Sequence, residues 1–122
     1  LSVDYNAGWT LTNNKTFNNK TKLFNHNLSA YIYPIKDHTI GFTWDDLQSN
    51  INNVTRRNSF YDVSYQYSLT KEKMDIELKV VNIANTNSFQ TIGFDSNLNQ
   101  TFVSNINIRP RQVLLTVKFN FK

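Results

Sequence analysis

The last ten residues, 113–122, constrain the fold more than any other segment of the chain. Side chains alternate there between two faces: Val113, Leu115, Val117, Phe119 and Phe121 on one, and Leu114, Thr116, Lys118, Asn120 and Lys122 on the other. Because strand side chains point alternately to opposite faces, this pattern predicts a β-strand with one apolar face. Such a strand fits a half-buried sheet of a soluble protein, or the wall of a membrane β-barrel between lipid and a wet lumen.

The composition suits a wall that needs only one apolar face. Hydrophobic residues make up 39% of the chain, yet it holds 9 Phe, 6 Tyr and 2 Trp, which favour a pleated, half-buried surface. Cysteine is absent, which excludes disulfides, thiolate metal sites and a cysteine nucleophile. Lys and Arg are spread along the chain, so the formal charge of +4 gives nucleic-acid binding little support.

The same alternation predicts six strands. They cover residues 1–11, 22–33, 39–45, 59–69, 74–83 and 112–121. The fourth is the clearest internal strand, because every second residue from Tyr61 to Leu69 is apolar or aromatic. His26 interrupts the apolar face of the second strand. Val81 breaks the alternation of the fifth, which indicates either a bulge or the exit of the strand from a membrane.

The connections between these strands alternate in length. They are long at 12–21, 46–58 and 84–111, and short at 34–38 and 70–73. Outer-membrane barrels alternate short periplasmic turns with longer extracellular loops. Loops of more than about 15 residues are uncommon in compact soluble domains. The loop lengths therefore favour the membrane barrel.

Aromatic residues are placed as two interfacial belts would require. Trp9, Trp44 and Tyr61 stand beside the long loops, and Tyr67, Phe119 and Phe121 near the opposite strand ends. We therefore expect an all-β fold, an antiparallel up-and-down transmembrane β-barrel with strands paired in sequence order. Six strands do not close a membrane barrel, because the smallest have about eight. Either a further hairpin lies within 84–111, or residues 1–122 are the C-terminal segment of a larger outer-membrane β-barrel domain. The start on a strand without a signal peptide favours the segment.

Two short motifs occur in the second half of the chain. The fifth strand ends in the sequence Val-Val-Asn-Ile-Ala-Asn at residues 80–85, and the last strand follows Pro110 and Arg111 and runs to Phe121. With the alternating strand that starts at Phe60, these motifs resemble the C-terminal end of TonB-dependent outer-membrane receptors, particularly of the Bacteroidetes type. The chain departs from that pattern by ending in Lys122 instead of an aromatic residue, and it holds no plug domain or TonB box.

The resemblance implies part of the barrel wall and extracellular loops of a receptor for nutrient uptake, located in the cell outer membrane. It implies as partners outer-membrane lipid, the remainder of the barrel with its plug domain, and TonB, with a surface lipoprotein as a further candidate. It implies no cofactor and no nucleic acid. Two other classes stay open: a non-transporting outer-membrane barrel with a structural, secretion or adhesion role, and a soluble all-β binding module.

We expect neither an enzyme nor a metal or cofactor site. Charged and histidine residues fit structural roles: His26 and His38 stand alone, Asp45 and Asp46 point to opposite faces, and Asp75, Glu77 and Lys79 fit a salt-linked lumen wall. The candidate ligand-facing loop is 84–111, whose aromatic and cationic residues are Phe89, Phe94, Phe102, Arg109 and Arg111. In the receptor family such loops face outward and help to capture ligand. Alternatively, these side chains pack on neighbouring loops, or the segment contains a further hairpin.

Overall fold

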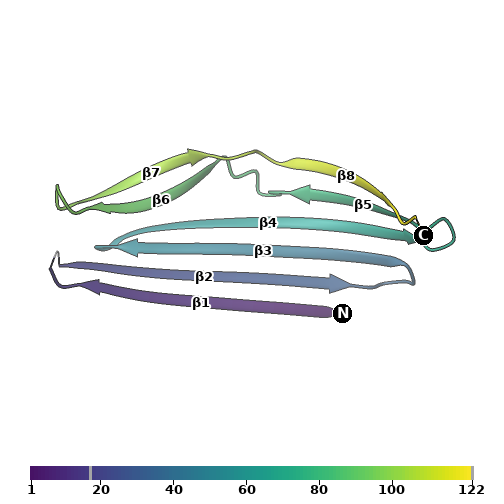
Figure 1. Cartoon of the computed structure of the whole chain (residues 1–122), viewed down its shortest axis with the longest axis horizontal. Coiled ribbons are helices and arrows are strands. Elements are labelled where there is room, and N and C mark those ends of the chain that lie inside the picture. Colours follow the sequence, from purple (N-terminus) through teal and green to yellow (C-terminus); the bar gives the residue numbers. More distant parts are fainter. Residues whose placement is uncertain (17, 122) are drawn as a thin grey trace.

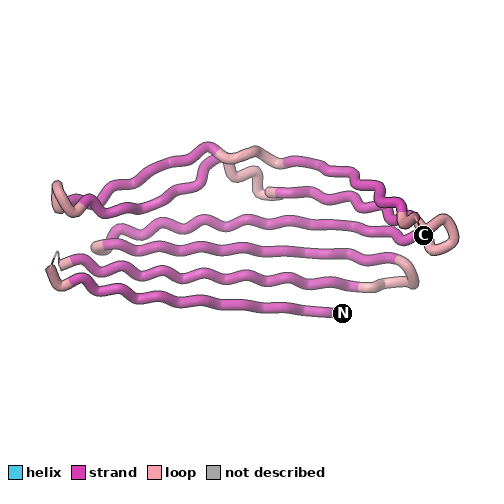
Figure 2. Tube along the Cα trace, viewed as in Figure 1, coloured by secondary structure: helices cyan, strands magenta, loops and turns pink. Residues whose placement is uncertain are grey.

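The described residues form antiparallel β-strands joined by turns (Figures 1 and 2). The computed structural model describes residues 1–16 and 18–121, so Lys122 of the predicted terminal strand lies outside the described residues. The strands are β1 (Ser2–Asn14), β2 (Asn19–Ile32), β3 (His38–Ile51), β4 (Val54–Leu69), β5 (Met74–Val81), β6 (Ser88–Asp95), β7 (Gln100–Asn107) and β8 (Gln112–Phe119). No helix in the described residues is long and apolar enough to cross a membrane.

Six of these strands form one sheet in the order β1-β2-β3-β4-β5-β8, and β6 and β7 form a separate hairpin. Every neighbouring pair is antiparallel. Figure 1 shows β1 to β4 as long neighbouring strands, with β5 and β8 at the end of the sheet that also holds both termini, and the β6–β7 hairpin at the other end. The prediction of an antiparallel all-β fold is confirmed, and the six predicted strands pair in sequence order.

The predicted long loops are wrong, because most of their residues belong to strands. β3 and β4 are joined only by Asn52 and Asn53, whose φ angles of 49° and 67° suit a two-residue type I′ hairpin. Residues 15–18 alone connect β1 to β2. The segment 84–111 contains the hairpin that the sequence left as an alternative. Loop length therefore no longer supports the barrel. Support for a barrel depends instead on how apolar and polar side chains are divided between the two faces of the sheet.

The strand register gathers apolar side chains on one face of the sheet. Directly opposed residues of an antiparallel pair point to the same face. Tyr65 opposes Leu78, which opposes Leu115, so these three side chains share a face. Repeating this step defines the apolar band: Val3, Tyr5, Leu28, Ala30, Ile32, Ile40, Phe42, Trp44, Tyr61, Val63, Tyr65, Tyr67, Leu69, Met74, Ile76, Leu78, Val80, Val113, Leu115, Val117 and Phe119.

The opposite face, called here the polar face, carries hydrophilic side chains at the same level. Among them are Ser64, Gln66, Glu77, Lys79, Thr116 and Lys118. The alternation predicted for the fourth strand and for the last strand is therefore confirmed, with the apolar side chains of both on one face and the polar ones on the other. Val81 opposes Gln112 in unbroken register and is the last residue of β5, so no bulge occurs there.

The sheet has almost no dry core. Among the described residues Ile51 is the one buried hydrophobic side chain, at 7% exposure. Apolar residues of the band stay exposed, with Leu115 at 69% and Val113 at 65%. No second sheet covers the band, so the described fold is not a sandwich.

Candidate functional site

The chain bends sharply between β5 and β6, and Asn82 fixes the bend. Asn82 is 4% exposed and has a φ of 56°, a conformation that Asn adopts more readily than most residues. Its backbone N–H donates to the carboxylate of Asp62 at 2.9 Å. Its side-chain amide donates to the carbonyl oxygens of Thr86 at 2.8 Å and Arg109 at 3.2 Å. Asn82 therefore ties the end of β5 to β4, to the segment that leads into β6 and to the segment that follows β7.

Both arginines of the predicted ligand-facing loop lie at this bend. The guanidinium of Arg111 donates to the carbonyl oxygen of Ile83 from Nε at 3.0 Å and from Nη2 at 2.5 Å. Its backbone N–H donates to the side chain of Asn85 at 3.0 Å. Arg109 contributes a carbonyl oxygen to Asn82, while its side chain is exposed. Arg111 thus has a structural role at the bend.

The β6–β7 hairpin packs against the far parts of β3 and β4. The side-chain amide of Asn58 in β4 donates to the carbonyl oxygen of Gln90 and accepts from its N–H, both at 2.9 Å. Phe89 stacks on Phe60 with ring centroids 6.3 Å apart. Near the hairpin tip, Asn52 donates to the hydroxyl of Thr101 at 3.3 Å. These contacts hold the hairpin on the polar-face side of β4.

The three predicted phenylalanines are all on the hairpin. Phe89 packs on the sheet, and Phe102 lies across Gly93, where a Cβ would come within 2.1 Å of its ring. Phe94 shares a register position with Thr101. The packing of Phe89 and Phe102 agrees with the alternative of contacts within the loop region. Ligand capture by these residues stays a prediction.

A cleft opens where β6 separates from β4. Its volume is about 560 Å³, and mostly polar residues line it: Arg57, Asn58, Ser59 and Tyr61 on β4, and Ala84, Thr86, Ser88 and Gln90 opposite. β4 pairs with β5 only from Val63 onward, so the outer part of β4 borders this cleft instead of a strand. The volume falls within the range of small-molecule sites. The cleft is therefore the candidate site for a small molecule beside the hairpin.

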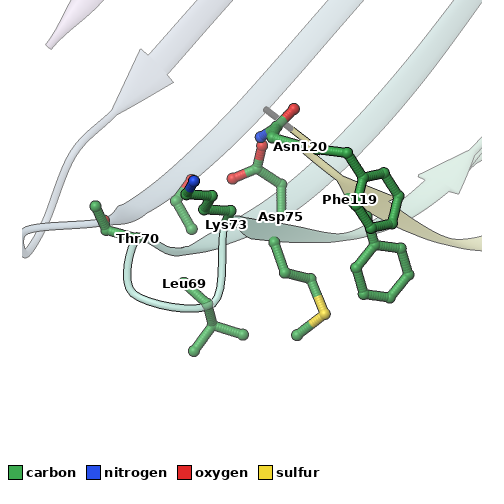
Figure 3. Close-up of a pocket in the computed structure, with 9 residues that line it drawn as sticks. Leu69, Thr70, Lys73, Asp75, Phe119 and Asn120 are labelled. Atoms are coloured by element: carbon green, nitrogen blue, oxygen red, sulfur yellow. The ribbon is translucent and has the colours of Figure 1, made fainter.

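A second open pocket lies at the opposite end of the sheet (Figure 3). Its volume is about 760 Å³ and it is formed by the β4–β5 turn and the end of β8. Figure 3 shows Leu69 and Phe119 projecting to one side of the ribbon and Asp75 with Asn120 to the other. The backbone N–H of Asn120 donates to the carbonyl oxygen of Lys73 at 2.8 Å, which ties the chain end to the turn. This pocket adjoins the apolar band at its end near the β4–β5 turn, where Leu69, Met74 and Phe119 line it.

A buried carboxylate lies on the face of the sheet that carries the apolar band, called here the band face. It lies just beyond Trp44 and Tyr61, which form the aromatic edge of the band. Asp46 is 4% exposed and accepts from Arg57 Nε at 2.8 Å and from the hydroxyl of Ser59. Burial raises the pKa of Asp46, but hydrogen bonds from Arg57 and Ser59 and the charges of Arg57 and His26 outweigh it, so this pKa lies below its ordinary 3.8. Asp45 points to the polar face and accepts from Asn27, so the opposite orientation of the two carboxylates is confirmed.

His26 lies within an aromatic group at the same level. Its Nδ1 is 2.5 Å from the hydroxyl of Tyr5, and its ring stacks on Trp44 with centroids 5.8 Å apart. Phe24 contacts it edge-on at 4.2 Å. Nδ1 of His38 forms a hydrogen bond of 2.6 Å with the hydroxyl of Tyr65. Within residues 1–16 and 18–121 no group of three His or carboxylate side chains could hold a metal ion.

The predicted salt link on the polar face has a different partner. Lys79 lies 3.7 Å from Asp62 in β4 and forms its ion pair there, not with Asp75 or Glu77. Asp75 opposes Lys118 in the register. The charges of this face are therefore balanced across neighbouring strands, which a pattern read along one strand does not reveal.

Sequence reasoning missed Asn58 as a structural residue. Its partner Gln90 lies 32 residues away, and asparagines are frequent enough that none stands out. Asn82 was marked only by the motif at residues 80–85. The Asn-Asn pair at 52 and 53 was a readable turn signal that the assumption of a long loop concealed.

Comparisons of the chain with protein-family models, curated proteins and solved structures found no match.

Proposed function

We propose that this chain forms part of the barrel wall and extracellular loops of a TonB-dependent outer-membrane receptor for nutrient uptake. The observation that supports this most is the separation of an apolar and a polar face across six strands. Along β4 the band runs from Tyr61 to Leu69, about 26 Å at ~3.3 Å per residue. Outer-membrane barrels carry an outward apolar band of roughly 25 Å edged by aromatic residues.

The exposure of the band supports lipid as its environment. Leu115, Val113 and Leu78 remain exposed without any covering layer among the described residues. Contiguous apolar surface of this extent marks an interaction surface, and hydrocarbon matches its chemistry. The polar face, with Glu77 and Lys118, suits a wet lumen.

The two ends of the sheet support an orientation. Beyond the aromatic edge at Trp44 and Tyr61, strands β1 to β4 continue outward, and the hairpin extends on the same side (Figure 1). At the other end the chain turns directly after the band, at 33–37 and 70–73. Barrels of this kind place short turns in the periplasm and long extensions outside the cell. The hairpin and the cleft beside β4 therefore face the exterior, where ligand would arrive.

The sheet has two free edges, β1 and β8. In hydrocarbon each unpaired backbone group costs several kcal/mol, so a membrane sheet must close on itself. We infer that further strands of the protein complete the barrel and that this sheet is its C-terminal part. The partners of the chain are then outer-membrane lipid, the remaining barrel with its plug, and TonB, with a surface lipoprotein as a further candidate.

Cysteine labelling in intact cells tests the orientation. These 122 residues contain no cysteine, and any cysteine elsewhere in the full-length protein is first replaced by serine, so each variant carries a single one. Leu98→Cys at the hairpin tip, where the side chain is 65% exposed, should react with a membrane-impermeant maleimide from outside. Glu72→Cys in the β4–β5 turn should react only after the outer membrane is opened. Equal labelling of both in intact cells, or recovery of the protein in the soluble fraction without detergent, would refute the barrel.

Coupling to TonB separates a receptor from a non-transporting barrel. In cells, the full-length protein should form photo-crosslinks with the periplasmic domain of TonB. Correct labelling of the two cysteines without any such crosslink would retain the barrel and exclude the receptor.

A further inference from the structure

Charged side chains of the six-stranded sheet are divided unequally between its faces. Five of its six carboxylates lie on the polar face, and the sixth, Asp46, is buried on the band face against Arg57. The band face holds three cationic side chains among the described residues: Lys20, Lys22 and Arg57. All three lie beyond the aromatic edge of the band. The band face therefore has a net positive charge, and this charge lies only in the part of the face beyond Trp44 and Tyr61.

Lys22 lines a groove with an aromatic floor. Trp9 opposes Phe24, which opposes Gln48. Together with Lys22 and Asn50 these three side chains line a groove of about 400 Å³. Gln48 also opposes Arg57 on β4, whose guanidinium donates to Asp46 in the adjacent row of the band face. Lys22 and Arg57 stand two strands apart and two positions apart along the strands. At ~4.8 Å per strand and ~3.3 Å per residue their Cα atoms are about 12 Å apart, so both long side chains can reach one headgroup.

The cations are available to a ligand. Arg57 uses Nε for Asp46, yet its side chain is 60% exposed, and its hydrogen bond and ion pair with Asp46 raise its pKa and keep it charged. Lys20 and Lys22 are exposed. Neither lysine side chain has a hydrogen-bond or ion-pair partner within the described part of the chain.

We propose that this groove binds the phosphorylated headgroup of a lipid in the outer leaflet. The proposal rests on the proposed function, since it requires the band face to meet lipid. Headgroups then lie at the level of the groove, just beyond the aromatic edge. Lysine and arginine extend toward that layer from apolar surface, and both bind phosphate through charge-assisted hydrogen bonds. Trp9 and Phe24 contact the boundary between headgroup and acyl chains, and the amides of Gln48 and Asn50 supply further polar contacts.

A pair of charge-matched variants tests the proposal. The full-length protein in neutral detergent is titrated with a fluorescent bisphosphorylated lipid A. Lys20→Gln/Lys22→Gln should weaken binding about 25-fold, since each cation near an anionic lipid surface contributes about fivefold. Arg56→Gln/Lys118→Gln removes the same charge from the polar face and should change binding less than about twofold. Equal effects of the two double variants would overturn the proposal, as would unchanged binding by the lysine variant.

Two further measurements show whether the phosphate comes from lipid or from solution, and whether a negative result rules out the headgroup site alone or the barrel as well. Competition by inorganic phosphate as strong as that by lipid would show a free-phosphate site and overturn the lipid proposal. If the two cysteine positions label as expected while the lysine variant binds lipid normally, only the headgroup site is wrong. If the labelling itself fails, the barrel is wrong and the headgroup site falls with it.

Discussion

The side chain of Asn58 and the backbone of Gln90 exchange two hydrogen bonds of 2.9 Å each, across 32 residues of sequence. Asn58 is 4% exposed, so both bonds are shielded from water. A side-chain amide here replaces the strand neighbour that β4 loses when the chain bends away after β5. Asn58 therefore supplies two shielded hydrogen bonds that hold β6 against the sheet, beside the ring contact of Phe89 with Phe60.

Substitution of Asn58 should loosen the hairpin. In Asn58→Ala the groups of Gln90 lose their partner, at about 1–3 kcal/mol for buried hydrogen-bonding groups. Hydrogen exchange of the Gln90 amide should then accelerate roughly 10-fold or more, while amides of β5 and β8 keep their rates. Asn105→Ala, at the position opposite Gln90 in the hairpin, is the matched control. An unchanged exchange rate at Gln90 would show that other contacts hold the hairpin.

Asn82 should be sensitive both to loss of its amide and to its backbone conformation. Asn82→Gly keeps the positive φ and removes the side-chain bonds, so the free energy of unfolding should fall by about 1–3 kcal/mol. Asn82→Ala should cost about 1 kcal/mol more, because a Cβ disfavours positive φ. Denaturant titration of the refolded protein measures both. A glycine variant as stable as the parent would remove the structural role of the amide.

Acid should weaken the fold partly through Asp46. The pKa of Asp46 is lower in the folded chain than its ordinary 3.8. Asp46 therefore stabilises the fold above about pH 4, and this contribution is lost as the pH falls through the folded-state pKa. Asp46→Asn should lower the free energy of unfolding at neutral pH and flatten its dependence on acid. Ser59→Ala removes one donor to Asp46 and should move the loss to higher pH. An Asn variant with the acid dependence of the parent would contradict this role.

Face assignment was predictable from sequence because alternation is a local property of strands. It correctly placed every second residue from Tyr61 to Leu69 on one face, and likewise Val113, Leu115, Val117 and Phe119. The same rule failed beyond the band, where the polarity of the faces changes: Gln48 and Arg57 lie on the band face, while Phe60 lies on the polar face. The weakened signal made paired strand residues look like loops.

The bend and the hairpin contacts were beyond local pattern reading. Their partners are brought together only by the register of the whole sheet, as with Asn82 and Arg109, which lie 27 residues apart. The two arginines predicted to face a ligand lie at the bend between β5 and β6, where the guanidinium of Arg111 donates to the backbone carbonyl of Ile83. Ligand binding by the hairpin depends on groups outside the chain, and its own sequence carries no pattern for them.

Arginine substitution on the two faces most directly tests whether the apolar band meets lipid. Leu78 lies in the central row of the band, and Thr116 lies on the polar face of the neighbouring strand. In a folding titration of the full-length protein in lipid vesicles, Leu78→Arg should cost about 2–4 kcal/mol and Thr116→Arg far less. Equal losses at the two positions would contradict a lipid-facing band and a wet polar face.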